Sequence, residues 1–236
     1  MSEMRLQKYL SEQGILSRRA AEEEIRRGGI TVNGVPAVLG MKIDPVRDTV
    51  LYRGKKIGAP VRHVYLMLNK PRGYVTTMCD EEGRPCVAQL VEDVGTRVYP
   101  VCRLDFDSEG LLLFTNDGEL ANRLTHPRYH KSKVYHVKLR GEVPSEKITA
   151  LSRPMEIDGY LTKPVHISIV TRKEDFTVLA MELFEGRNRQ IRKMCESLGL
   201  AILSLKRISI GEVKLGNLAP GKWRYLTRSQ VESLKK

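Results

Sequence analysis

A short acidic run between two apolar segments holds the side chain that is best placed for chemistry. Asp105 lies in the run Arg103–Leu113, after the strand-like segment 97–101 and before the apolar segment 110–115. A carboxylate at such a junction can be half-buried and rigidly held, which suits a nucleophile. An Asp between two strands is also a common turn residue. The run by itself leaves a catalytic role and a purely structural role open.

The overall charge favours a polyanionic partner. Lys and Arg number 40 against 28 Asp and Glu, a net charge of +12, and nucleic acid is the usual partner of such a chain. An anionic membrane is disfavoured, because the sequence has no long apolar run, signal peptide or lipidation motif. The cysteines and histidines lack metal-ligand spacing. We therefore expect no metal site, reduced thiols and a cytoplasmic location.

The elements that come first along the chain predict a small separate unit over residues 1–58. Apolar residues at helical spacing indicate a helix that ends at Gly14. Ser17 offers an N-cap to a second helix that runs through Arg27. A β-rich run follows, broken by Asn33-Gly34, which is a strong hairpin signal. The predicted order is helix, helix, hairpin, strand.

The remainder, residues 59–236, predicts an α+β domain after a linker at Gly58-Ala59-Pro60. Strands and helices interleave without regular βαβ units, which favours a mainly antiparallel mixed sheet flanked by helices. The apolar, strand-like runs are 64–68, 135–139, 165–170, 177–184 and 208–213. The helical patterns are 118–125, 145–151, 188–198 and 229–235.

The first unit resembles an S4 RNA-binding domain over residues 5–34. The resemblance implies that basic side chains on the paired helices face RNA phosphates, which gives affinity without sequence choice. The candidates are Lys8, Arg18, Arg19, Arg26 and Arg27. An alternative for part of this charge is a solvated helix face, because Glu22 and Arg26, and Glu23 and Arg27, stand four residues apart.

Residues 103–118 resemble the catalytic motif of the small- and large-subunit ribosomal RNA pseudouridine synthases. Four further blocks agree in the family's order, at 68–73, 133–135, 185–194 and 220–227. Two positions depart from the family. Cys102 stands where Gly is frequent, and Ser108 stands where Thr is common but keeps the hydroxyl.

The resemblance implies isomerisation of uridine in RNA without a cofactor. Asp105 is then the catalytic carboxylate, either attacking the anomeric carbon or assisting formation of a glycal. Arg192 matches the arginine that pairs with this aspartate, through two parallel hydrogen bonds. A phosphate contact is the alternative for Arg192. Tyr135 matches the tyrosine that stacks on the target uracil and can act as a base, and a half-buried strand aromatic is its alternative.

Further basic residues are expected to contact the RNA or order the catalytic loop. They are Arg103, Arg187, Arg189 and Lys193. The segments 80–85 and 120–127 look closer to the large-subunit branch of the family, so we expect an enzyme that modifies large-subunit rRNA. We also expect it to be a monomer. The alternatives are a small-subunit enzyme and a non-catalytic S4-type assembly protein. A glycosidase is disfavoured, because no second acid is convincingly placed beside Asp105.

Overall fold

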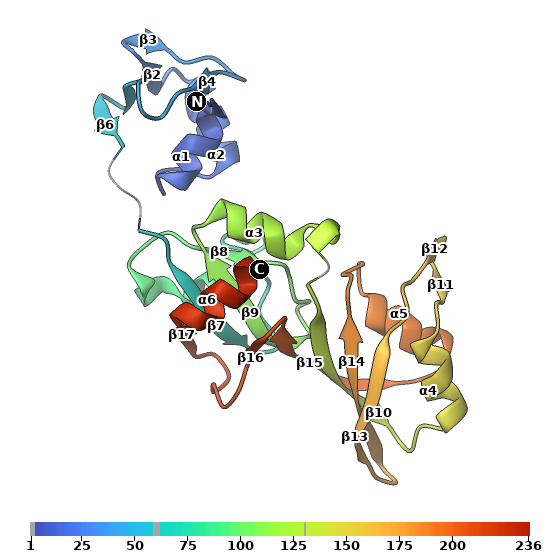
Figure 1. Ribbon diagram of the computed structural model, residues 1–236. Coiled ribbons are helices and arrows are strands. Elements are labelled where there is room, and N and C mark those ends of the chain that lie inside the picture. The colour runs from blue at the N-terminus through green and yellow to red at the C-terminus, as the bar shows by residue number, and fades with distance from the viewer. Residues whose placement is uncertain (1–2, 59–61, 130) are drawn as a thin grey trace. The chain divides into compact units, whose positions relative to one another are not determined.

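A computed structural model describes residues 3–58, 62–129 and 131–236 (Figure 1). The chain divides into two compact units, Met1–Val64 with Asn116–Gly118, and Tyr65–Thr115 with Glu119–Lys236. The predicted linker at 58–60 lies largely outside the described residues, and the boundary between residues 58 and 59 stays a prediction. Among the helices of the described residues, none is long and apolar enough to cross a membrane.

The small unit opens with the two predicted helices, α1 (Leu6–Glu12) and α2 (Arg18–Arg26). The hydroxyl of Ser17 accepts a hydrogen bond from the backbone N–H of Ala20 at 3.1 Å, which confirms the predicted N-cap. Gly28 follows α2 with a φ of +73°, a left-handed conformation that ends helices.

A four-stranded sheet completes this unit, in the order β3 (Val35–Pro36), β2 (Ile30–Val32), β5 (Val50–Tyr52) and β6 (Lys55–Ile57). A separate pair joins β1 (Met4–Arg5) to β4 (Lys42–Ile43). Asn33 and Gly34 both have positive φ, +52° and +83°, as the tight turn of a hairpin requires. The predicted hairpin is therefore confirmed, and the helices pack on it through a core that includes Leu6, Leu10 and Ile30.

The large unit is built on a nine-stranded sheet with the main order β13-β14-β10-β15-β9-β7-β17. Neighbouring strands pair antiparallel except β15 and β9, which pair parallel, so the predicted mainly antiparallel mixed sheet is confirmed. The main strands are β7 (Tyr65–Lys70), β9 (Glu109–Thr115), β10 (Lys133–Arg140), β13 (His166–Arg172), β14 (Phe176–Leu183), β15 (Ile202–Ile210) and β17 (Trp223–Tyr225). Two short strands are attached, β8 (Tyr99–Val101) on β9 and β16 (Val213–Lys214) on β15.

Helices lie beside this sheet at the four predicted places. They are α3 (Gly118–Thr125), α4 (Ser145–Ser152), α5 (Gln190–Ser197) and α6 (Arg228–Lys235). The 3-10 turns Val87–Leu90, Glu92–Val94 and Pro127–Tyr129 and the small hairpin β11 (Glu156–Ile157) with β12 (Tyr160–Leu161) complete the unit. Two apolar clusters form its core, one around β10, β14, α4 and α5, the other around β7, β9, α3 and α6.

One predicted strand differs from the structure. The apolar run 208–213 is interrupted at Gly211, whose φ is +52°, so it divides between the end of β15 and β16. The strand β15 instead begins at Ile202 and includes Lys206 and Arg207, charged residues that hid it from an apolar pattern. Arg207 lies on the inward face and is 1% exposed.

Candidate active site

The loop that carries Asp105 joins two paired strands. Residues 102–108 connect β8 to β9, which pair antiparallel with Val101 opposite Leu113. Residues outside the loop hydrogen-bond to its backbone. The hydroxyl of Thr76 donates to the Leu104 carbonyl at 2.6 Å, and the N–H of Gly73 donates to the Phe106 carbonyl at 2.8 Å. The Asp105 side chain stays 36% exposed. A rigid loop thus presents a half-buried carboxylate.

Lys70 lies beneath this loop and is fully buried. Its Nζ donates to the carbonyls of Pro71, Asp105 and Ser108 at 3.1, 3.0 and 2.8 Å. These bonds use all three donors of the ammonium group. The backbone of Asp105 is therefore tied to Lys70, the last residue of β7.

Burial gives Lys70 a testable effect on stability. It lowers the pKa of Lys70 from 10.5 to about 8. Between these values the unfolded chain keeps a proton that the folded chain has released, so Lys70 makes the free energy of unfolding rise with pH. We expect wild type to gain stability relative to Lys70→Met from about pH 8 to 10.5, at a slope approaching 1.4 kcal/mol per pH unit.

Denaturant unfolding at several pH values measures this slope. Trp223, the single tryptophan, lies on β17 and reports on the large unit. The comparison with Lys70→Met cancels the contributions of other groups that titrate in the same pH range. Lys133 is one of these groups, because burial lowers its pKa as well. Parallel pH curves for the two proteins would contradict the assignment to Lys70.

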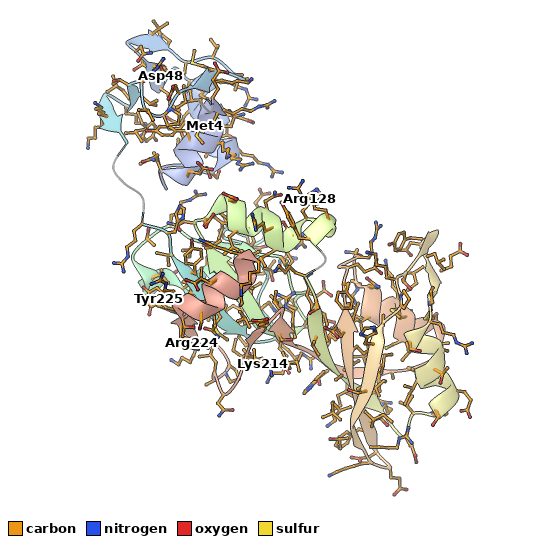
Figure 2. The ribbon with its side chains drawn as sticks, in the orientation of Figure 1. Met4, Asp48, Arg128, Lys214, Arg224 and Tyr225 are labelled. Atoms are coloured by element: carbon orange, nitrogen blue, oxygen red, sulfur yellow. The ribbon has the colours of Figure 1, made fainter. Side chains whose placement is uncertain are left out.

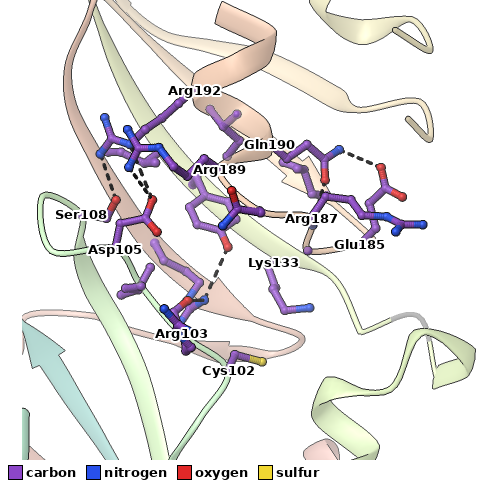
Figure 3. A pocket seen from close by; sticks show the side chains of 18 of the residues that line it. Cys102, Arg103, Asp105, Ser108, Lys133, Glu185, Arg187, Arg189, Gln190 and Arg192 are labelled. Atoms are coloured by element: carbon purple, nitrogen blue, oxygen red, sulfur yellow. Dashed lines mark hydrogen bonds and ion pairs between the residues drawn. The ribbon is translucent and has the colours of Figure 1, made fainter. Parts of the chain in front are cut away.

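Two arginines hold the carboxylate of Asp105 (Figure 3). Its Oδ2 lies 3.4 Å from Nη1 of Arg189 and 3.7 Å from Nε of Arg192. Arg192 directs Nη2 to Asp107 Oδ1 at 2.9 Å and to the Ser108 hydroxyl at 3.0 Å. The expected pair of parallel bonds from Arg192 to Asp105 is therefore wrong in detail, because Asp107 and Ser108 take one arm of the guanidinium. Arg189, predicted to contact RNA, shares the Asp105 carboxylate.

Unusual backbone conformations flank the carboxylate. Arg189, the N-cap of α5, has a φ of +51°, and Cys102, at the start of the loop, has a φ of +65°. Residues other than Gly in this region cost about 1–3 kcal/mol each and cluster at functional sites. The conformation of Cys102 also gives the physical reason why Gly suits that position, since Gly has no Cβ to clash.

A pocket of about 660 Å³ opens beside the loop. Asp105, Tyr135 and Arg192 all line it, so the structure brings the three predicted catalytic residues together. Arg103, Arg187 and Arg189 line it as well. Lys193, predicted to bind RNA, instead forms an ion pair with Asp158 and is not among the lining residues described. Within the described ranges, no group of three or more His, Cys, Asp or Glu side chains could hold a metal ion.

One wall of the pocket involves residues that the sequence did not single out. The guanidinium of Arg187 lies 3.7 Å from the ring centroid of Tyr160, on the β11–β12 hairpin. Tyr160 donates its hydroxyl to Glu185 at 2.8 Å, and Gln190 donates to the same carboxylate at 2.7 Å. The hairpin is thereby joined to the basic segment that precedes α5.

The predicted RNA-contact residues of the small unit are all exposed: Lys8, Arg18, Arg19, Arg26 and Arg27. The sequence suggested ion pairs of Arg26 with Glu22 and of Arg27 with Glu23. Neither pair is formed among the described residues. Arg27 approaches Glu24 at 3.7 Å instead. Glu24 is the buried carboxylate of α2 and also binds Arg53 at 3.0 Å, so it attracts the nearby cations.

Arg207 is a further pocket residue that the sequence analysis missed. A usable signal existed, because strand alternation places Arg207 on the same face as the buried Leu205. A charged residue at an inward position is unusual and points to a special role.

Comparisons with known proteins agree along the whole chain. The family model described as RNA pseudouridylate synthase matches residues 64–197, and the S4 domain model matches residues 4–50. An uncharacterised RNA pseudouridine synthase of Aquifex aeolicus is 42% identical, covering 99% of this chain and 94% of that protein. The ribosomal large subunit pseudouridine synthase B of Bacillus subtilis is 38% identical, covering 98% and 95%. A crystal structure of a pseudouridylate synthase superimposes with a TM-score of 0.70 at 30% identity, covering 98% and 99%.

Proposed function

The chain belongs to the RNA pseudouridylate synthase family and contains an S4 domain, and we propose that it converts a specific uridine of large-subunit ribosomal RNA to pseudouridine. The observation that carries this proposal is the pocket that Asp105, Tyr135 and Arg192 line together. Its volume of about 660 Å³ is in the range that accommodates a small molecule or an extruded nucleotide.

In the proposed reaction the bond from the ribose anomeric carbon to N1 of uracil breaks, and the same carbon is joined to C5. Asp105 assists as an ionised carboxylate, either by attack on the anomeric carbon or by removal of a sugar proton. Arg189 and Arg192 hold and orient it, because both guanidinium groups approach the same carboxylate oxygen, Oδ2. Tyr135 contacts the uracil from strand β10, which β15 separates from β9 in the sheet.

The basic residues fall into two proposed groups of RNA-binding side chains. Arg103, Arg187 and Arg189 meet the target nucleotide and its phosphates at the pocket. Lys8, Arg18, Arg19, Arg26 and Arg27 neutralise phosphates from the S4 domain. RNA binding measured over a salt series tests the second group, because replacing one phosphate-binding cation with a neutral residue lowers the salt slope by about 1.

The choice of large-subunit rRNA rests on the sequence segments that resemble that branch and on the similarity to the Bacillus subtilis enzyme named for the large subunit. Pseudouridine mapping across both rRNAs, in cells with and without this protein, tests the choice. We expect one large-subunit position to lose its pseudouridine without the protein. A lost small-subunit position would reassign the enzyme to that branch, and unchanged maps in both subunits would overturn the rRNA substrate.

We further propose that the enzyme acts as a monomer in the cytoplasm. The described residues that line the pocket all belong to one unit of this chain, which supports a site formed within a single copy. Light scattering of the purified protein, alone and with RNA, checks the oligomeric state.

A further inference from the structure

Arg207 is a buried cation at the pocket that the proposed reaction does not use. Its side chain is 1% exposed, although it lines the pocket. The carboxylates of Asp105 and Asp107 pair with Arg189 and Arg192, and Arg207 has no ion pair within the described part of the chain. A buried charge without a counter-charge is costly, so its hydrogen bonds must offset that cost.

The guanidinium of Arg207 makes three hydrogen bonds. Nε donates to the Leu111 carbonyl of β9 at 2.7 Å. Nη1 donates to the Arg103 carbonyl, before Asp105, and to the Tyr135 hydroxyl, both at 3.4 Å. Nη2 is buried and has no hydrogen-bond partner in the described structure. One side chain on β15 thus links Tyr135 on β10 to the start of the loop that carries Asp105 and to β9, the strand that follows the loop.

The direction of the bond to Tyr135 follows from chemistry. A guanidinium has only donors, so the Tyr135 oxygen must accept. The hydrogen of the Tyr135 hydroxyl is then free to point elsewhere, and Tyr135 itself lines the pocket. The bonds to Leu111 and Arg103 fix the guanidinium, whereas the loop has independent support from Lys70, Thr76 and Gly73.

We propose that Arg207 is a positioning residue that acts through Tyr135, orienting its hydroxyl hydrogen into the pocket toward the uracil. When the bond between the anomeric carbon and N1 breaks, its electron pair stays on the uracil and spreads to the two carbonyl oxygens. A donor fixed in place before reaction stabilises such developing charge. The electron pair then forms the bond from C5 to the anomeric carbon, C5 loses its proton and N1 gains one, so the reaction stays an isomerisation.

This inference rests on the proposed function, and a double-mutant cycle tests it. The substrate is an RNA fragment containing the uridine identified by mapping, and the readout is the single-turnover rate at saturating protein. We expect Arg207→Gln to lower this rate roughly 10- to 100-fold with RNA affinity unchanged. In the Tyr135→Phe background the same change should have an effect of less than about threefold, because the group it acts through is already gone.

Two further variants separate positioning from damage to the fold. Arg207→Lys keeps the charge but has a single nitrogen, so we expect it to lose rate while the Trp223-monitored unfolding midpoint is retained; it replaces Arg207→Gln if that variant does not fold. Arg172→Gln is the matched control, because Arg172 also donates to a backbone carbonyl, that of Val143, and does not line the pocket. It should leave the rate unchanged.

The possible outcomes are distinguishable. Suppose that the wild type is active. The role of Arg207 is then overturned, with the proposed function intact, if Arg207→Gln reacts at the wild-type rate. It is also overturned if the effects of Arg207→Gln and Tyr135→Phe are additive. An equal loss of rate and of RNA affinity also overturns it, in favour of a structural role. A wild type that forms no pseudouridine in any rRNA overturns the proposed function first.

Discussion

Asp105→Asn is expected to reduce pseudouridine formation by roughly 10⁴-fold or more, equivalent to about 5.5 kcal/mol of transition-state stabilisation. The substitution keeps the size of the side chain but removes the negative charge that either route requires. Arg189 and Arg192 converge on this one carboxylate. The neighbouring acid, Asp107, is bound to Arg192 and cannot replace Asp105 without moving the loop.

The protein should still fold, because the bonds that hold residue 105 go to its backbone carbonyl and to its neighbours. Asp175→Asn is the matched control: Asp175 is an exposed residue of the turn between β13 and β14 and does not line the pocket. Mapping of rRNA from cells that carry each variant measures the effect. If Asp105→Asn cells kept their pseudouridine, the catalytic role would be refuted, and a non-catalytic S4 assembly protein would become the better account.

Gly110→Ala is expected to destabilise the large unit by about 3 kcal/mol or more. Gly110 has a φ of +105°, and a Cβ there would lie 2.3 Å from the carbonyl oxygen of Arg207 and 2.8 Å from its backbone nitrogen. These atoms belong to the neighbouring strand β15, which pairs with β9 at this point. Backbone atoms cannot give way as a flexible side-chain end can, so the two strands must separate.

Gly95→Ala separates the steric effect from the conformational one. Gly95 also has a positive φ, +72°, but a Cβ there would meet nothing within 4 Å. The Gly95→Ala substitution should lower the free energy of unfolding by only about 1 kcal/mol. Denaturant unfolding followed by Trp223 fluorescence compares the two variants. If both variants lost the same free energy of unfolding, the close approach of β9 and β15 would be unimportant for stability. Because Gly110 faces the backbone of Arg207, the variant should also lose activity beyond its loss of stability.

Local signals in the sequence correctly predicted several elements of this protein, and Figure 2 shows the side chains that these elements carry. Ser17 caps its helix, Asn33-Gly34 makes its hairpin and the run 118–125 forms α3, because each is decided by neighbours along the chain. The family resemblance brought Asp105, Tyr135 and Arg192 into one hypothesis. Without that resemblance, a turn residue was the better interpretation of Asp105.

The tertiary structure decided what these residues touch. Arg189 joins Arg192 at Asp105 across more than 80 positions of sequence, a proximity that local pattern cannot reveal. The inward position of Arg207, and the passage of its backbone against Gly110, arise from pairing of strands that are nearly 100 residues apart. Glycine and a buried arginine look like breaks in an apolar pattern when only the sequence is read. Their role depends on which strands become neighbours, and long-range packing settles that.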